Sequence, residues 1–381
     1  MKNIFFYKKR TIEIKSLLLF VLMLFCFIPL TAQNVNIQFF PEKINHNRTE
    51  IVIPNVNGYE VLKADLHLHT IFSDGNVWPS FRVQEAWREG LDVISITDHI
   101  EYLPNKDYLN ADFNTSCNIA APEAEKLGMI FIRGAEITRK QGVIGHFNAI
   151  FIKDANLLKV DDPKEAIKAA KAQGAFVTLN HPAWKMDTCK FSSFQKEVME
   201  EGLIDGIEVI NNHEYYARAL SWCHDLNKTI ISASDAHDPI ADQFKLNRAG
   251  LENIRYRPMT LIFVKERSQK GVREALDSRR TLGYFDGRIV GDKELLGALF
   301  NASVKFNKVS ADKKTDYYML ENNSGFPYRI RIGSMEYLIS PMSTISLSFP
   351  KTTKSVEIEV LSMYYYENLS PKFTISLESN N

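Results

Sequence analysis

Residues 63–75 read KADLHLHTIFSDG and carry two histidines in a short apolar segment, followed by an aspartate. In a β-strand alternate side chains share a face, so His67 and His69 are expected to project together. Such a pair can hold one metal ion because histidine is the commonest metal ligand, although either ring could instead be an ordinary core histidine. The surrounding sequence decides between these alternatives.

On both sides of this segment, short apolar runs alternate with helix-like stretches. PSFRVQEAWREG (79–90) has Pro79 suited to a first helical turn and Gly90 suited to a C-terminal cap. The continuously apolar run LDVISITDH (91–99) follows it. Six or seven such units predict a parallel sheet with helices outside, closed or nearly closed into a β/α barrel over residues 61–289.

The pattern changes after residue 290. YYMLENNSGFPYRIRIGSMEYLISPMSTISLSF (317–349) alternates with a period of two and contains aromatic residues and turn signals. These features predict a small all-β, sandwich-like domain over residues 290–381. Residues 34–60 are a connecting segment that leads into the barrel.

The first 33 residues have the layout of a secretory signal peptide. A basic stretch (1–15) precedes the apolar run SLLLFVLMLFCFIPL (16–30), which TAQ (31–33) follows. The run of about 15 residues is shorter than the roughly 20 that a spanning helix needs, so a retained membrane anchor is the weaker alternative. We expect an exported protein, periplasmic or secreted, with no membrane span after cleavage.

The charge balance argues against nucleic acid as the main partner. The whole chain has 46 basic and 46 acidic residues. Removing residues 1–33, which hold five basic residues and one acidic residue, leaves 46 − 5 = 41 and 46 − 1 = 45, a net charge of −4. Phosphate-backbone binding favours a basic domain instead. Cys117, Cys189 and Cys223 remain, and none forms a CxxC pair, so no thiolate metal site is indicated.

Polar residues gather at the ends of the strand-like runs. These ends read TDH (97–99), GAE (134–136), NHP (180–182) and SDAH (234–237). In a β/α barrel the C-terminal strand ends converge on one mouth. Each residue alone could cap a helix or bind a loop, but together they predict one site. Its candidate members are His67, His69, Asp74, His99, Glu136, His146, His181, Asp235 and His237.

The ordered set DLHLHT, SDG, TDH, GAE, NHP and SDAH resembles the PHP (polymerase and histidinol phosphatase) family over roughly residues 60–288. The resemblance implies a distorted (β/α)7 barrel. Some secreted bacterial phosphodiesterases look similar over the barrel and also carry a C-terminal β appendage. A small-molecule phosphate ester, most readily a diester, is therefore the expected substrate.

Carried over residue by residue, the resemblance implies two or three metal ions. The first would be held by His67, His69, Glu136 and Asp235; the second by Asp74, His99 and a shared Glu136; the third by His146, His181 and His237. Many relatives have histidine where this chain has Asp74, and the counterpart of His146 lies at variable spacing. Imidazole and carboxylate ligands without thiolate suit manganese, zinc or iron.

A metal pair bridged by Glu136 can clamp the attacking and leaving oxygens of a displacement at phosphorus and bring the pKa of a bound water from about 15.7 toward roughly 7. Glu136 and Asp235 are thus catalytic candidates, and His213, which follows another strand, is a candidate for protonating the leaving group. Arg139 and Lys140 follow Glu136 closely and are candidates for binding phosphate, or are simply solvated loop charges.

Asp98 is expected to orient a ligand rather than bind metal.

Three alternatives to a phosphodiesterase stay open. One is a phosphomonoesterase of the same family. Another is an amidohydrolase-like hydrolase of C–N or C–O bonds, which Glu136 disfavours because those enzymes often bridge their metals with a modified lysine. The last is a non-catalytic binding protein that has kept its metals.

Overall fold

The computed structural model describes residues 48–244 and 256–377. They belong to one compact unit that begins at Asn47. The predicted signal peptide and residues 34–47 of the connecting segment lie outside the described residues. Within the described ranges, no helix is both long enough and apolar enough to span a membrane.

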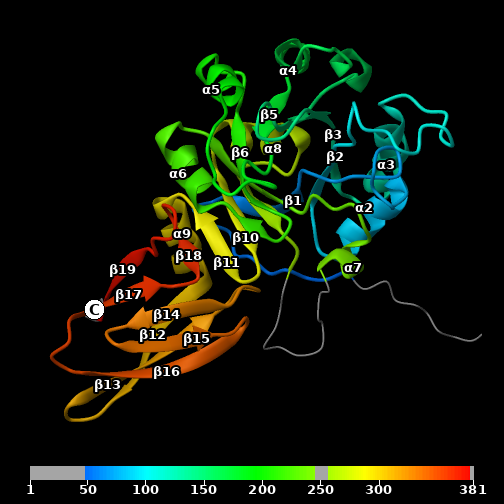
Figure 1. Ribbon diagram of the computed structural model, residues 1–381. Helices are drawn as coiled ribbons and strands as arrows, with labels where there is room; N and C mark the ends of the chain where they lie inside the picture. The colour runs from blue at the N-terminus through cyan, green and yellow to red at the C-terminus, as the bar shows by residue number, and fades with distance from the viewer. Residues whose placement is uncertain (1–47, 245–255, 378–381) are drawn as a thin grey trace, which may run out of the picture. The chain divides into compact units, whose positions relative to one another are not determined.

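A mixed, curled sheet of 12 strands forms the centre of the fold (Figure 1). Its strands are β1 Glu60–Asp65, β2 Val93–Ile96, β3 Ile130–Thr138, β4 His146–Ile150, β5 Phe176–Leu179, β6 Gly206–Asn211, β7 Glu214–Tyr215, β8 Thr229–Ala233, β9 Met259–Val264, β10 Thr281–Phe285, β11 Arg288–Gly291 and β18 Met363–Tyr364. Most residues of β2, β4, β5, β6, β8 and β9 are buried, as the continuous apolar runs predicted.

Helices connect most of these strands, as the alternation predicted. They are α2 Pro79–Arg88, α3 Thr115–Lys126, the 3-10 helix η1 Ala155–Leu158, α4 Pro163–Ala172, α5 Ser193–Glu200, α6 Ala217–Asp225, α7 Ile240–Phe244, α8 Gln269–Asp277 and α9 Lys293–Ser303. Pro79 is at the start of α2, and Gly90 follows that helix with φ +89°. A Cβ atom at Gly90 would lie 2.6 Å from the Thr49 carbonyl oxygen, so glycine is required there.

The prediction of a parallel sheet is wrong in several places. β4 runs antiparallel to both β3 and β5, and β9 runs antiparallel to β1 and β10. The pairs β10–β11 and β6–β7 are antiparallel as well. Only residues 139–145 join β3 to β4, whereas a parallel connection needs about a dozen residues or more. Regular alternation of strand and helix is therefore interrupted, and the count of seven β/α units stays a prediction.

The curled sheet nearly closes on itself where β1 and β8 end. Leu68 and Ala236 form a parallel bridge, the His69 amide donates to the Ala236 carbonyl (3.1 Å), and the Asp235 amide donates to the His67 carbonyl (3.0 Å). The C-terminal ends of strands β1 and β8 thus meet at the residues that the sequence marked as ligands.

Two small antiparallel sheets follow the central one. One contains β12 Val304–Ala311, β13 Thr315–Asn322 and β16 Ser343–Pro350; the other contains β14 Tyr328–Ile332, β15 Met335–Ile339, β17 Ser355–Val360 and β19 Lys372–Ser376. Burial alternates along β13, β14 and β17, which confirms the predicted period of two. Their inward side chains share one hydrophobic core with the central sheet, and β18 pairs with β11. The boundary at residue 290 stays a prediction.

Candidate metal centre

The structure brings all nine predicted ligands into one cluster at the closing end of the curled sheet. They come from the end of β1, the loop after it, the ends of β2, β5 and β8, the middle of β3 and the start of β4. The nine are His67, His69, Asp74, His99, Glu136, His146, His181, Asp235 and His237. Their role as ligands stays a prediction, and the geometry shows how they are grouped.

The first group contains His67, His69 and Asp235. The two Nε2 atoms lie 3.0 Å apart, and Asp235 Oδ1 lies 3.3 Å from Nε2 of His67 and 3.1 Å from Nε2 of His69. The carboxylate oxygens of Glu136 lie 3.6 and 3.7 Å from the same nitrogens. The predicted face-sharing of the two histidines is therefore correct.

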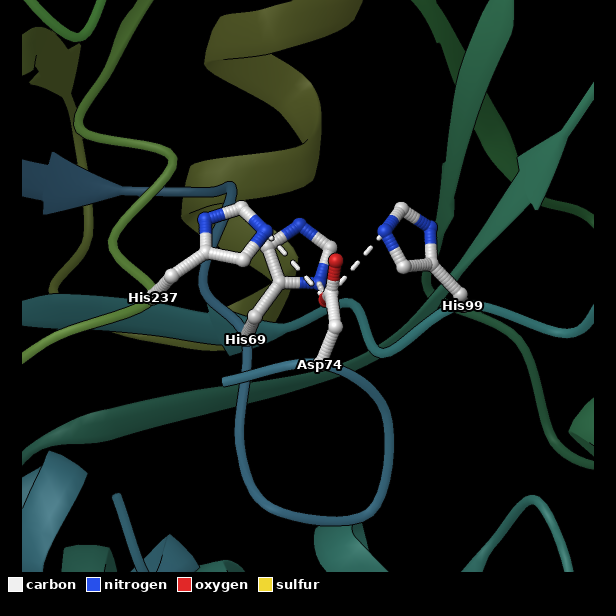
Figure 2. A group of neighbouring side chains, drawn as sticks. All are labelled: His69, Asp74, His99 and His237. Carbon is white, nitrogen blue, oxygen red and sulfur yellow. Dashed lines mark ion pairs between the residues drawn. The ribbon is translucent and has the colours of Figure 1, made fainter. Parts of the chain in front are cut away.

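The second group contains Asp74, His99 and His237, with His69 beside them. Figure 2 shows the Asp74 carboxylate between the rings of His99 and His237. Asp74 Oδ1 lies 3.3 Å from Nε2 of His99 and 3.2 Å from Nε2 of His237. The His237 and Asp74 side chains are 33% and 23% exposed, the highest values in the cluster, so this group is its open edge.

The third group contains Glu136, His146 and His181. Glu136 Oε1 lies 3.3 Å from Nδ1 of His146 and 3.7 Å from Nε2 of His181. His67 Nε2 is also close enough to share an ion with Glu136 and His181. The partition that the resemblance implied differs here, because the geometry places His237 in the second group and not with His146 and His181.

The donor set fits divalent metal ions. Asp74 Oδ1 and Asp235 Oδ1 are buried and accept no hydrogen bond, although several imidazole nitrogens surround them. A buried carboxylate oxygen without a donor is costly, and a cation is the partner that such an oxygen lacks. The nitrogen and oxygen ligands, with no thiolate, suit manganese, zinc or iron.

The cluster's electrostatics tie carboxylates and imidazoles together. Burial would raise the pKa of Glu136, but the positive charge of His99 and neighbouring imidazoles outweighs it and holds that pKa well below its usual range. Burial lowers the pKa of His99, but Glu136 and Asp74 outweigh it and raise the pKa to about 10. Burial and the charges of His237 and His99 lower the pKa of His69 to about 4. A metal ion bound at neutral pH would therefore have to displace the extra proton of His99, whereas His69 carries no such proton.

Glu208 contacts the candidate site, and sequence reasoning did not single it out. It is fully buried in β6, and its Oε1 lies 2.8 Å from Nδ1 of His67. Its Oε2 accepts hydrogen bonds from the His181 amide and from Asn211 Nδ2, both at 2.8 Å. A carboxylate on Nδ1 fixes the imidazole tautomer whose Nε2 is free to bind metal.

Asp98 holds the loop between His69 and Asp74. The Asp98 carboxylate accepts hydrogen bonds from the Thr70 amide and hydroxyl and from the Ser73 hydroxyl, each at 2.7 Å. Gly75 lets the loop pass close beneath, because a Cβ atom there would lie 2.7 Å from the carbonyl carbon of His69. Asp98 thus binds the loop that carries His69 and Asp74, and its role in orienting a ligand stays a prediction.

Three other candidates lie outside the cluster. Arg139 pairs with Glu101 and donates to the carbonyls of Thr138 (3.0 Å) and Val160 (2.7 Å), so its guanidinium is already engaged by neighbouring segments. Lys140 is exposed. His213 is also exposed, and its Nε2 lies 3.1 Å from the Gln243 carbonyl oxygen. Among the described contacts of these side chains, none reaches a cluster member, and their roles stay predictions.

A solved structure decides the family. It is a two-domain protein from Bacteroides vulgatus, described as containing a predicted PHP-like metal-dependent phosphoesterase, and it superposes with a TM-score of 0.82 at 38% identity. The match covers 87% of this chain and 99% of that one. This chain belongs to the PHP-like metal-dependent phosphoesterase family. The family expectation drawn from the motifs is confirmed, and membership supports a metal-dependent hydrolase.

More distant likenesses accompany it. A candidate metal-dependent phosphoesterase from Bifidobacterium adolescentis aligns at 19% identity and a TM-score of 0.36, over 46% of this chain and 88% of its own. Endonuclease Q bound to a 27-mer duplex aligns at 16% identity and a TM-score of 0.37, over 61% of this chain and 60% of its own. Such TM-scores support no conclusion about this chain. No family model and no curated protein matches it.

Proposed function

We propose that this PHP-like protein is an exported phosphoesterase that uses two or three divalent metal ions to hydrolyse a small phosphate ester, most readily a diester. The observation that carries the proposal is the pair of buried, undonated oxygens on Asp74 and Asp235 within a cluster of six imidazoles. Bound metal ions would supply hydroxide at neutral pH and neutralise charge on the phosphoryl oxygens.

Glu136 is the residue best placed to bridge two ions. Its Oε1 lies beside His146 and His181 in the third group, and its two oxygens lie 3.6 and 3.7 Å from the Nε2 atoms of His67 and His69 in the first. Asp235 would bind the ion of the first group together with His67 and His69. Both carboxylates are ionised at neutral pH, because the surrounding imidazoles hold each pKa well below its usual range against the opposing effect of burial.

The open edge at Asp74 and His237 is the side from which a substrate would approach. Aromatic rings stand near the cluster: Tyr102, 54% exposed, lies 6.0 Å from the His99 ring, and Trp184 lies 5.3 Å from the His181 ring. The Lys185 ammonium lies 4.1 Å from the Trp184 ring centre. Rings and a cation around an anion-binding centre suit a small organic phosphate ester. Lys185 therefore joins Arg139 and Lys140 as a candidate phosphate contact.

The proposal is tested by comparing bis(p-nitrophenyl) phosphate with p-nitrophenyl phosphate on protein that has been stripped with chelator and reloaded with manganese or zinc. We expect metal-restored turnover that favours the diester. Preference for the monoester would make the protein a phosphatase of the same family. A lack of turnover of either ester, in protein that still binds metal, would contradict a phosphoesterase and favour an amidohydrolase-like or binding role.

Export is tested separately. The full chain, expressed in a Gram-negative host, is expected in the periplasmic fraction with an N-terminus near residue 34. Recovery of the uncleaved chain in the cytoplasm would contradict the proposed signal peptide.

A further inference from the structure

Arg82 is a fully buried arginine beneath the candidate metal centre. It lies on the inward face of α2, one turn after Pro79 and one turn before Ala86. Its guanidinium donates to the backbone carbonyls of His69 (3.1 Å from Nε and 3.0 Å from Nη2), Ala236 (3.1 Å), His237 (3.1 Å) and Asp238 (3.0 Å). One side chain thus binds four carbonyls on two loops.

The two loops come from distant parts of the sequence and carry the second group of ligands. One follows β1 and holds His69 and Asp74, and the other follows β8 and holds His237. The His69 and His237 rings stack at 4.3 Å between centres, so a small shift of either loop changes the group. Apart from the guanidinium, the backbone hydrogen bonds between these two described loops run from Asp235 to the His67 carbonyl (3.0 Å), from His69 to the Ala236 carbonyl (3.1 Å) and from Asn76 to the His237 carbonyl (2.8 Å).

Burying a guanidinium is costly unless all of its donors find partners. Glu85 provides the balancing charge for Arg82 and also accepts a hydrogen bond from the Ile240 amide (3.1 Å). Arginine has five donors in a fixed planar fork, whereas lysine has three on a single nitrogen that cannot reach four separated carbonyls. The arrangement is therefore specific to arginine and not merely to a positive charge.

We propose that Arg82 is a positioning residue that sets the distance between the two loops and thereby the site formed by Asp74, His99 and His237. The inference rests on the proposed metal centre and is independent of which ester is hydrolysed. Loss of the Arg82 guanidinium releases one loop from the other. In the described part of the chain, Arg82 makes no hydrogen bond with the segments that carry Glu136, His146 and His181, which lie on β3, on β4 and after β5. Metal affinity at the second group falls, and metal affinity at the third group is retained.

The test is a Co²⁺ titration of chelator-stripped protein, followed by visible absorbance and by metal content after gel filtration. Arg82→Lys is expected to fold and to bind at one class of site on the order of ten-fold more weakly, as for other residues that orient ligands. Excess Co²⁺ restores that site. Combined with His237→Ala, Arg82→Lys is expected to add no further weakening, because both act on the same site.

Arg48→Lys is the matched control. Arg48 also donates to two carbonyls, Gly90 (3.3 Å) and Leu91 (3.0 Å), and to the Asp92 carboxylate (2.8 Å). These acceptors directly precede β2, whereas the cluster residue His99 follows that strand. Arg48→Lys is expected to titrate as the wild type does. Equal weakening in Arg48→Lys and Arg82→Lys, or a wild-type titration in Arg82→Lys, would overturn the inference.

If Arg82→Lys does not fold, Glu85→Gln replaces it. This variant loosens the guanidinium without removing it, so a smaller weakening at the same class of site is expected. A folded Glu85→Gln that titrates as wild type would contradict the role given to Arg82. Wild-type protein that takes up no Co²⁺ would instead overturn the metal centre itself, and Co²⁺ uptake without hydrolysis of either ester would overturn only the phosphoesterase.

Discussion

Glu208→Gln is the substitution that best separates orientation of a ligand from the ligand itself. Glu208 is fully buried and binds three groups: Nδ1 of His67 on one oxygen, and the His181 amide and Asn211 Nδ2 on the other. Glutamine has nearly the same volume, so the core keeps its packing. It has only one acceptor oxygen, however, and cannot satisfy all three groups.

Either orientation of the glutamine amide harms the centre. If its oxygen serves the His181 amide and Asn211, its NH₂ faces Nδ1 of His67 and drives the imidazole proton to Nε2, the nitrogen that faces Asp235. If its oxygen serves His67, two buried donors lose their acceptor at about 1–3 kcal/mol each. We therefore expect metal affinity to fall by on the order of 10- to 100-fold, as when such partners are removed from metal-bound histidines. That is about 1.4–2.7 kcal/mol of binding free energy.

The assay is a competitive metal titration of stripped protein with a chromophoric chelator, repeated on turnover at saturating metal. Saturating metal should recover much of the activity, because all of the residues that bind the metal directly are intact. Glu197→Gln, which changes an exposed carboxylate paired with Lys164 (2.6 Å), is the matched control. Wild-type metal affinity in folded Glu208→Gln would refute the role assigned to Glu208.

Three further outcomes follow from the same geometry. Glu136→Ala should reduce turnover to background at any metal concentration through loss of the shared ligand, while Glu197→Gln should retain turnover. Steady-state rates with the preferred ester check this outcome. Unchanged turnover in Glu136→Ala would contradict the bridging role. Phe147→Ala, at a fully buried position in β4, should lower the free energy of unfolding by about 3–5 kcal/mol in urea titrations, and a loss below about 1 kcal/mol would mean that β4 packs differently. In metal-free protein, the raised pKa of His99 adds stability that is fully present below about pH 6.5 and is lost as the pH rises toward about 10. The Tm of stripped protein should therefore fall over that range, while its metal affinity rises. A rising Tm would contradict the pairing of His99 with Glu136 and Asp74.

The sequence predicted the location of the centre well, because strand ends of a curled sheet converge whatever the details of its topology. The HxH spacing placed His67 and His69 on one face, and the other motifs ended their strands beside them. Spacing along the chain does not say which residues share an ion. His237 reaches Asp74 only because β1 and β8 close the sheet, and that contact is a tertiary one.

Two missed residues did leave a signal. Glu208 is an acid within the apolar run GIEVI (206–210), and Arg82 falls on the inward face of an amphipathic helix with Pro79 and Val83. A charged residue at a position patterned for the core is rarely buried without a partner, so each marked a polar contact in advance. The antiparallel β4 was also foreseeable, since residues 139–145 leave no room for a crossover helix.

Arg139 left no such signal. Its place directly after β3 suits a phosphate contact and a loop clamp equally, and only the position of Glu101 shows that the guanidinium is already paired. The acceptor comes from the loop after β2, whose path no local pattern defines.

The most direct test of the central claim is anomalous diffraction from crystals of the manganese-reloaded protein. The account predicts anomalous peaks within coordination distance of Asp74, His99 and His237, and of Glu136, His146 and His181. Well-ordered side chains at both groups with no anomalous peak between them would contradict the metal centre.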